Sequence, residues 1–325
     1  MSKNLFKWPV IDALNGSLMS PDYLRESARL GACAFHITVN NFREVKPYPS
    51  LAEALQDLSL CRKRFTGLNE HAVLVRQCSD LDAALEQKKI GIIMGYQNIP
   101  DSGDPIELLY LFYELGVRII QPTHNNRNLI GDGCSEPANA GLSKLGRLVI
   151  QEMNRLGMVI DLSHVGEATS LDILESSKDP VTITHSNADA VLSSPRNKSD
   201  RVLDALAANH GVIGVTFLPP VVRTPGTGQC TLDDVLAQFD HLAERIGPSH
   251  IGIGSDFITG QPRERYAALL RQPEIYGEWP WHYPIAGLAQ LEDLFDALLA
   301  RGFSEQDVQG IAGGNFRRIF QQVWK

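Results

Sequence analysis

The sequence lacks any apolar run near the roughly 20 residues that a membrane-spanning helix needs. Its first residues, MSKNLFKWPVIDALNG, contain no apolar signal-peptide core. It also lacks an excess of positive charge, since 30 Lys and Arg against 38 Asp and Glu give a formal net charge of −8 at pH 7. An acidic chain has no electrostatic reason to bind nucleic acid or an anionic membrane surface. The sequence therefore predicts a cytoplasmic protein with neither kind of partner.

Cysteine is scarce and shows no pairing pattern. The five cysteines are odd in number and have no CxxC spacing, which argues against a disulfide framework and favours reduced thiols. Repeats and low-complexity tracts are also missing, so nothing marks a domain boundary. We expect one domain over residues 1–325.

Short apolar runs alternate with helix-periodic segments along almost the whole chain. Between the runs lie patterns such as LSKLGRLVIQEMNRLG, whose apolar residues recur at spacings of three and four. Strands buried on both faces and separated by helices indicate a parallel sheet with right-handed crossovers. The nine runs are residues 10–14, 32–39, 72–77, 89–97, 117–123, 159–164, 181–185, 212–218 and 251–256. They predict a (β/α)8 barrel of the TIM type, with 72–77 as an accessory ninth run.

Two features follow the last predicted strand. Residues 257–286 form a long segment rich in Pro, Trp and Tyr, including Trp279, Trp281 and Tyr283. Loops this long are typically functional, and we expect a lid over the barrel mouth, with an oligomer contact as the alternative. Residues 287–325 predict C-terminal helices, the second of which begins at Ser304 with Asp307 completing a capping box.

Two histidines end neighbouring predicted strands, His164 in VIDLSH and His185 in PVTITHS. The strand-to-helix loops of such barrels converge at the carboxyl ends of the strands. Two imidazoles one βα unit apart can share a divalent metal there. The alternative for each is a hydrogen-bonded structural histidine, but the equivalent positions favour a metal site.

Three further residues at strand ends suit catalysis or substrate binding. Asp256 ends the last strand and could pass a proton from water to a leaving group, with a turn-forming role as the alternative. His124, after VRIIQPT, could stabilise an oxyanion or simply bond within a polar turn. Arg196 in SSPRN could clamp a substrate carboxylate or form a surface ion pair.

Other candidate ligands are weaker. Gln97 ends the strand GIIMGYQ, where a carboxylate could bridge two metals but a neutral amide cannot. The ring nitrogen of His36 and the thiol sulfur of Cys134 could complete the coordination sphere of a metal. A buried structural role explains His36 at least equally well, and the alternative for Cys134 is that it only lines the cavity. This set argues for one metal or none.

At this point the chain resembles the membrane dipeptidase (renal dipeptidase) family, the M19 metallopeptidases of the amidohydrolase superfamily. The resemblance covers nearly the whole chain and is carried by GLSKLGRLVIQEMNRLGMVIDLSHVG, THSNADAV with SSPRN, IGIGSDF, and RGFSEQDVQGIAGGNFRRIF. It implies a (β/α)8-type barrel, often homodimeric, in which two zinc ions cleave dipeptides and related amides.

The resemblance assigns roles by position. His164 and His185 match the two histidines that hold one metal, His124 and Arg196 match substrate-binding residues, and Asp256 matches the proton-shuttling carboxylate. The first strand departs from the family, because IDALNG stands where the family has a sequence like IDGHND. Leu14 thus stands where the resemblance implies a ligand histidine, and Gly16 stands where it implies a ligand aspartate. Gln97 stands where it implies the bridging glutamate.

Three interpretations remain open. The first is a dipeptidase-like metallohydrolase that uses one divalent metal, zinc or else iron or manganese, on His164 and His185. It would cleave an amide bond in a small carboxylate-bearing substrate. The second is a barrel that has lost hydrolysis and serves binding or proton transfer. The third is a non-catalytic scaffold, which predicts a barrel mouth filled with apolar side chains.

Overall fold

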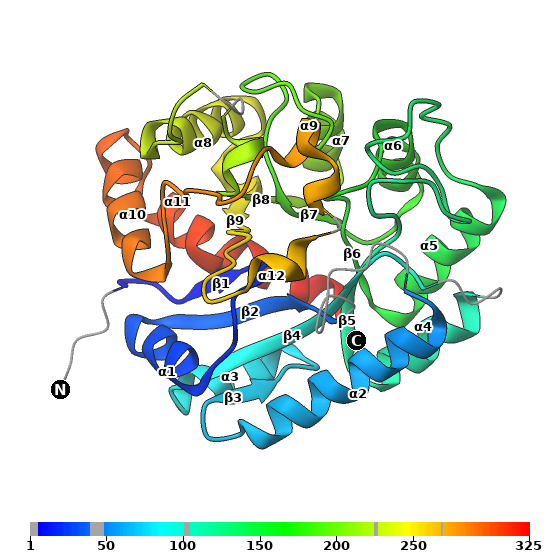
Figure 1. The fold of residues 1–325 in the computed structure, drawn as a ribbon, viewed down its shortest axis with the longest axis horizontal. Helices are drawn as coiled ribbons and strands as arrows, with labels where there is room; N and C mark the ends of the chain where they lie inside the picture. Colours follow the sequence, from blue (N-terminus) through cyan, green and yellow to red (C-terminus); the bar gives the residue numbers. More distant parts are fainter. Residues whose placement is uncertain (1–5, 40–48, 101–104, 224–226, 268) are drawn as a thin grey trace.

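Eight parallel strands form a closed ring surrounded by helices (Figure 1), which confirms the predicted (β/α)8 barrel. The structure is a computed structural model that describes residues 6–39, 49–100, 105–223, 227–267 and 269–325. The strands are β1 (Val10–Asp12), β2 (Ala32–Thr38), β3 (Ala72–Leu74), β4 (Ile90–Gln97), β5 (Val117–Gln121), β6 (Val159–Ile160), β7 (Thr182–Ser186), β8 (Val212–Val215) and β9 (Ile251–Ile253).

The ring closes in sequence order except for one strand. β1 pairs with β9 through Asp12 and Ile253, and β6 joins β7 through a parallel bridge between Asp161 and Thr182. β3 pairs only with the first residues of β4 and lies off the ring. The run at 72–77 is therefore the accessory strand, as the sequence predicted.

The strands are buried over most of their length because both of their faces are covered. All eight residues of β4, IGIIMGYQ, are buried. One face of such a strand packs inside the ring and the other contacts the surrounding helices. Seven of the nine strands end earlier than predicted, whereas β4 ends at Gln97 as predicted and β7 runs one residue further, to Ser186. Gln97 and His185 therefore lie at strand ends, and His124, His164 and Asp256 lie in loops at the barrel mouth.

The helices follow the strands around the outside of the ring. They are α1 (Pro21–Leu30), α2 (Leu51–Gly67), α3 (Cys78–Glu86), α4 (Pro105–Glu114), α5 (Lys144–Leu156), α6 (Glu167–Ser176), α7 (Asp200–Ala208), α8 (Leu232–Ile246), α9 (Pro273–Tyr276), α10 (Leu291–Ala300), α11 (Glu305–Gln309) and α12 (Asn315–Val323). Shorter helical turns are η2 (Pro219–Val221), η3 (Pro248–His250), η4 (Arg263–Tyr266), η5 (Leu269–Arg271), η6 (Leu288–Gln290) and the π-turn η7 (Gly310–Gly314).

Helix α5 illustrates how the sequence sets these elements. Ser143 caps its start by accepting a hydrogen bond from the Gly146 backbone N–H, and Gly157 ends it with a left-handed φ of 80°. Its apolar stripe, which includes Val149 and Met153, is buried against the ring. Helix α5 packs against β6, the strand that leads to His164.

The C-terminal helices close the end of the barrel opposite the strand carboxyl ends. The capping box between Ser304 and Asp307 is present, as predicted. The π-turn then passes so close to β1 that a Cβ at Gly313 would lie 2.7 Å from the Pro9 carbonyl oxygen. Only glycine fits at this crossing. The C-terminal helices cover this end of the barrel, and the open mouth lies at the other end.

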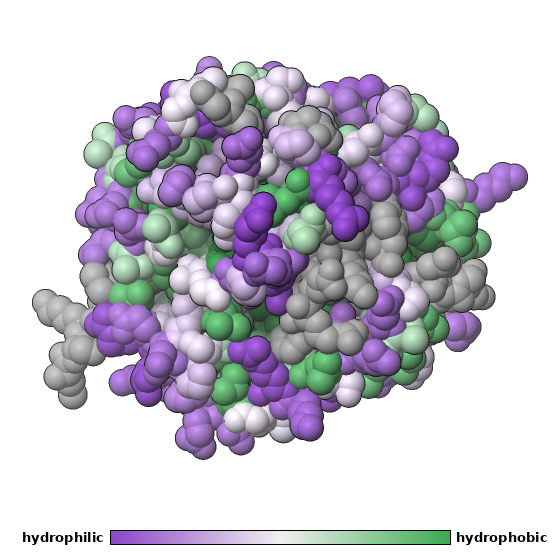
Figure 2. Space-filling model, in the orientation of Figure 1, coloured by the Kyte–Doolittle hydropathy of each residue, from purple (hydrophilic) through white to green (hydrophobic). Residues whose placement is uncertain are grey.

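The outer surface on the face shown in Figure 2 is mostly hydrophilic, with apolar residues in separate patches. Within the described residues, no helix combines the length and apolar character needed to cross a membrane.

Candidate functional site

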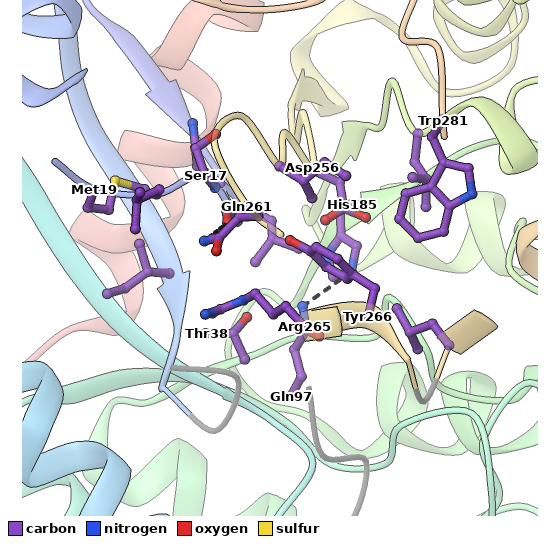
Figure 3. A pocket seen from close by; sticks show the side chains of 18 of the residues that line it. Ser17, Met19, Thr38, Gln97, His185, Asp256, Gln261, Arg265, Tyr266 and Trp281 are labelled. Atoms are coloured by element: carbon purple, nitrogen blue, oxygen red, sulfur yellow. Dashed lines mark hydrogen bonds between the residues drawn. The ribbon is translucent and has the colours of Figure 1, made fainter. Parts of the chain in front are cut away.

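A cavity of about 90 Å³ opens at the carboxyl ends of the strands. Six of the predicted site residues line it, namely Gln97, His124, His164, His185, Arg196 and Asp256. Figure 3 shows Gln97, His185 and Asp256 facing the cavity, with Arg265 and Tyr266 of the segment after β9 reaching across it. The space admits several water molecules.

His164 and His185 point their ring nitrogens at each other. The two Nε2 atoms lie 3.0 Å apart. The Nδ1 of His164 lies 2.7 Å from the amide oxygen of Asn125. Because an amide oxygen only accepts hydrogen bonds, His164 carries its proton on Nδ1 and its Nε2 bears a lone pair.

The same reasoning sets the proton of His185. Its Nδ1 lies 2.7 Å from the hydroxyl oxygen of Thr184, and that hydroxyl donates to the buried carboxylate of Asp161 at 2.9 Å. The hydroxyl therefore accepts from the Nδ1–H of His185. Two unprotonated Nε2 atoms thus face each other, an arrangement that a shared cation stabilises.

A proton is not well suited to be that cation. Burial holds the pKa of His164 and of His185 well below the usual range for histidine, and the nearby Arg196 guanidinium lowers both further. Both imidazoles are therefore neutral at physiological pH. Neutral imidazole is the form that binds a divalent metal.

The remaining candidate ligands lie around this pair in unequal positions. The amide nitrogen of Gln97 lies 3.4 Å from Nε2 of His185, so rotation of that amide would present its oxygen instead. His36 donates from Nδ1 to the Ala13 carbonyl at 2.5 Å. Its Nε2 is buried and forms no hydrogen bond with the described residues. A Cβ at Gly95 would lie 2.1 Å from this nitrogen, so glycine leaves room for the ring.

Cys134 lies at the other edge of His164. Its thiol is 3.3 Å from the Asn125 amide oxygen, the group bonded to Nδ1 rather than Nε2 of His164. Within the described part of the chain, no three His, Cys, Asp or Glu side chains gather closely enough to hold a metal. The site therefore offers two imidazoles and one nearby neutral amide.

Leu14 and Gly16, which follow β1, have no side-chain atom that can bind a metal. Leu14 and Gly16 both line the cavity. Leu14 is only 3% exposed, and a Cβ at Gly16 would lie 3.1 Å from the Phe257 carbonyl oxygen. An apolar side chain and a hydrogen atom thus stand where the family resemblance places two metal ligands.

His124 and Arg196 form one wall of the cavity. The His124 ring stacks on His164 with centroids 4.0 Å apart and planes 19° apart. Burial, assisted by Arg196, lowers the pKa of His124 to about 3, so its ring is neutral. Its Nδ1 is buried without a hydrogen-bond partner among the described residues.

Arg196 is 1% exposed and donates to the backbone carbonyl oxygens of Ser163 and His185. Among the described residues its Nε has no hydrogen-bond acceptor. A buried guanidinium with a free donor attracts an anionic group into the cavity.

Asp256 projects into the cavity from a strained backbone. Its φ of 53° lies in the left-handed region, and Tyr283 donates a hydrogen bond to its carbonyl oxygen at 2.7 Å. Burial raises the pKa of the Asp256 carboxyl to about 6, although Arg196 opposes the rise. A carboxyl with this pKa can take up and release a proton near neutral pH.

Several residues of the segment 257–286, which the sequence predicts to be a lid, line the cavity, including Gln261, Arg265 and Tyr276. Its aromatic side chains pack with Leu218 and Val221 in a small apolar cluster separate from the barrel core. Trp281 lines the cavity, whereas Trp279 stacks on Tyr266 with centroids 5.8 Å apart. The lid has a packed interior of its own.

Sequence reasoning missed the residues that orient the histidines, Asn125, Asp161 and Thr184. Each lies within three residues of a candidate histidine in the chain, in THNN, IDLSH and TITH. Polar residues close to a candidate histidine in the sequence could have indicated them, because metal-binding histidines usually bond a carboxylate or carbonyl oxygen through their other ring nitrogen.

Comparison with known families places the site in context. Residues 19–271 match the family model described as membrane dipeptidase, peptidase family M19. A crystal structure titled amidohydrolase from Pseudomonas aeruginosa superimposes with a TM-score of 0.87 and 31% identity, covering 98% of this chain and 97% of that one.

Two fungal relatives are similar in sequence. Dipeptidase tcpJ of Claviceps purpurea is 30% identical over 286 residues, and dipeptidase verJ of Clonostachys rogersoniana is 31% identical over 287 residues. Each match covers 87% of this chain. The matched region spans 63% of the Claviceps protein and 68% of the Clonostachys protein.

Proposed function

Since the chain belongs to the membrane dipeptidase family, peptidase family M19, we propose that it is a dipeptidase-like hydrolase. It cleaves an amide bond in a small substrate that carries a carboxylate, and it uses one divalent metal. The observation that carries this proposal is the pair of unprotonated Nε2 atoms, 3.0 Å apart, of His164 and His185.

The residues fit one metal and not two. Tetrahedral zinc with Zn–N bonds of about 2.0–2.1 Å would place two imidazole nitrogens roughly 3.3 Å apart, close to the observed spacing. His164 and His185 would hold the ion, with the Gln97 amide as a weak third ligand. Zinc is the expected metal, with iron or manganese as alternatives. Such an ion lowers the pKa of a bound water towards neutrality and polarises a carbonyl.

Arg196 supplies the substrate's anchor. Its buried guanidinium lines the cavity, and its Nε has no hydrogen-bond acceptor among the described residues. A substrate carboxylate would complete its hydrogen bonding and bring the scissile amide over the two histidines.

Asp256 and His124 carry the proton chemistry. With a pKa of about 6, Asp256 is mostly ionised at neutral pH and can accept a proton from the attacking water. It can then give that proton to the leaving amine. Neutral His124, stacked on His164, can donate an N–H to the oxygen on which negative charge develops.

A second candidate function has its own support. Leu14 and Gly16 replace two family ligands, and Gln97 replaces a third, so a barrel that binds a small anion or transfers a proton without hydrolysis remains an alternative. The scaffold hypothesis has less support, because it predicts a mouth filled with apolar side chains, whereas His, Arg and Asp side chains line the cavity beside apolar ones such as Leu14 and Leu218.

Elemental analysis combined with a dipeptide hydrolysis screen tests the proposal. Protein purified without added metal should hold about one metal ion per chain and release amino acids from some dipeptides. Metal-free protein that gains no activity with Zn²⁺, Mn²⁺ or Fe²⁺ would favour the second function. The homodimer and the cytoplasmic location stay predictions, and light scattering and cell fractionation would test them.

A further inference from the structure

Asn125 lies between the imidazoles of the cavity and the lid. Its amide oxygen accepts from Nδ1 of His164 at 2.7 Å and from the Cys134 thiol at 3.3 Å. Its amide nitrogen donates to the Tyr276 hydroxyl at 2.8 Å. Tyr276 belongs to α9, about 150 residues away in the chain, so one side chain links the histidine to the lid.

The backbone of Asn125 is fixed as well. Its φ of 61° is left-handed, a conformation that asparagine tolerates better than most residues. The side chain is buried, and the carbonyl oxygen accepts from the Ser135 N–H at 2.8 Å. Gly133 packs so tightly here that a Cβ would lie 2.2 Å from the Asn125 carbonyl carbon. The amide is therefore held at one place beside His164.

The contacts of that amide decide which His164 nitrogen carries the proton. With the amide oxygen towards the ring, the proton stays on Nδ1 and Nε2 is free to bind a metal. Without this acceptor, the proton would gain more on Nε2, where the unprotonated Nε2 of His185 lies 3.0 Å away. That second arrangement removes the lone pair a metal needs.

We propose that Asn125 is a positioning residue that holds His164 in its Nδ1–H tautomer and couples that tautomer to the seating of the lid through Tyr276. The expected effect of Asn125 on metal affinity rests on the proposed function. The tautomer of His164 does not rest on it, because it is a property of the metal-free protein.

Nitrogen NMR of histidine-labelled, metal-free protein reads the tautomer directly. Wild type should show His164 protonated on Nδ1. Asn125→Gly, which suits the left-handed backbone and removes the amide, should shift the proton to Nε2. Asn125→Asp keeps an acceptor and should retain Nδ1–H. Asn126→Ala, at the neighbouring asparagine, is the matched control and should leave the spectrum unchanged.

Calorimetric titration with Zn²⁺ gives a second readout. Loss of an outer hydrogen-bond partner typically weakens metal binding about 10–100-fold, and we expect this for Asn125→Gly but not for Asn125→Asp. Tyr276→Phe, which removes only the lid contact, should weaken binding about two- to tenfold.

Three outcomes would overturn the inference: Nε2–H on His164 in wild type, an unchanged tautomer in Asn125→Gly, or Nε2–H in Asn125→Asp. The last result keeps the test decisive even where the glycine variant does not fold. Wild type that shows Nδ1–H but binds no Zn²⁺ would refute the metal site while supporting the positioning role.

Discussion

Removal of either facing imidazole should abolish the stabilisation that metal binding gives the fold. A ligand that binds only the folded state raises the free energy of unfolding by about 2.7 kcal/mol at a concentration 100 times its Kd. Unfolding entropy of about 2.1 cal/mol/K per residue gives roughly 0.7 kcal/mol/K for this chain. Zn²⁺ should therefore raise the Tm of wild type by about 4 °C.

His164→Ala and His185→Ala should each lose almost all of this rise, because one imidazole and a neutral amide hold zinc weakly. His71→Ala is a matched control, since His71 precedes β3, outside the ring of strands. Differential scanning calorimetry with and without Zn²⁺ gives the measurement. An equal rise of Tm in wild type and both variants would show that the metal binds elsewhere, and no rise in wild type would refute the site.

Three further predictions follow from the cavity. Asp256→Asn should reduce kcat at least about 100-fold while metal content stays unchanged, and undiminished turnover would remove Asp256 from the mechanism. In wild type, the kcat/KM profile should fall as pH drops below about 6, because protonation of Asp256 removes the base; a flat profile between pH 5 and 7 would contradict this. Restoring the family's ligands with Leu14→His, Gly16→Asp and Gln97→Glu should raise metal content from one to two per chain, and unchanged content in folded protein would argue against these positions facing the site.

Much of the fold was predictable because burial on both faces leaves a local signal. Each of the nine apolar runs forms a strand, and the accessory one is β3, as expected. Strand ends were less predictable. The run at 159–164 was too long because the Asp161 carboxylate, rather than a strand ladder, accepts the Ser163 and Thr184 N–H groups.

The candidate site was predictable only in part, for a physical reason. His164, His185 and Asp256 could be placed because each lies at or shortly after the end of a strand, and strand ends converge. The hydrogen bonds of Asn125 to His164 and Tyr276 depend on how a distant lid folds back over the mouth. No local pattern encodes that contact.

Anomalous X-ray scattering from crystals of protein purified without added metal tests the central claim most directly. We expect one peak within bonding distance of Nε2 of both His164 and His185, and an absorption edge that identifies the metal. Two peaks in the cavity, or a peak bound to neither imidazole, would contradict it.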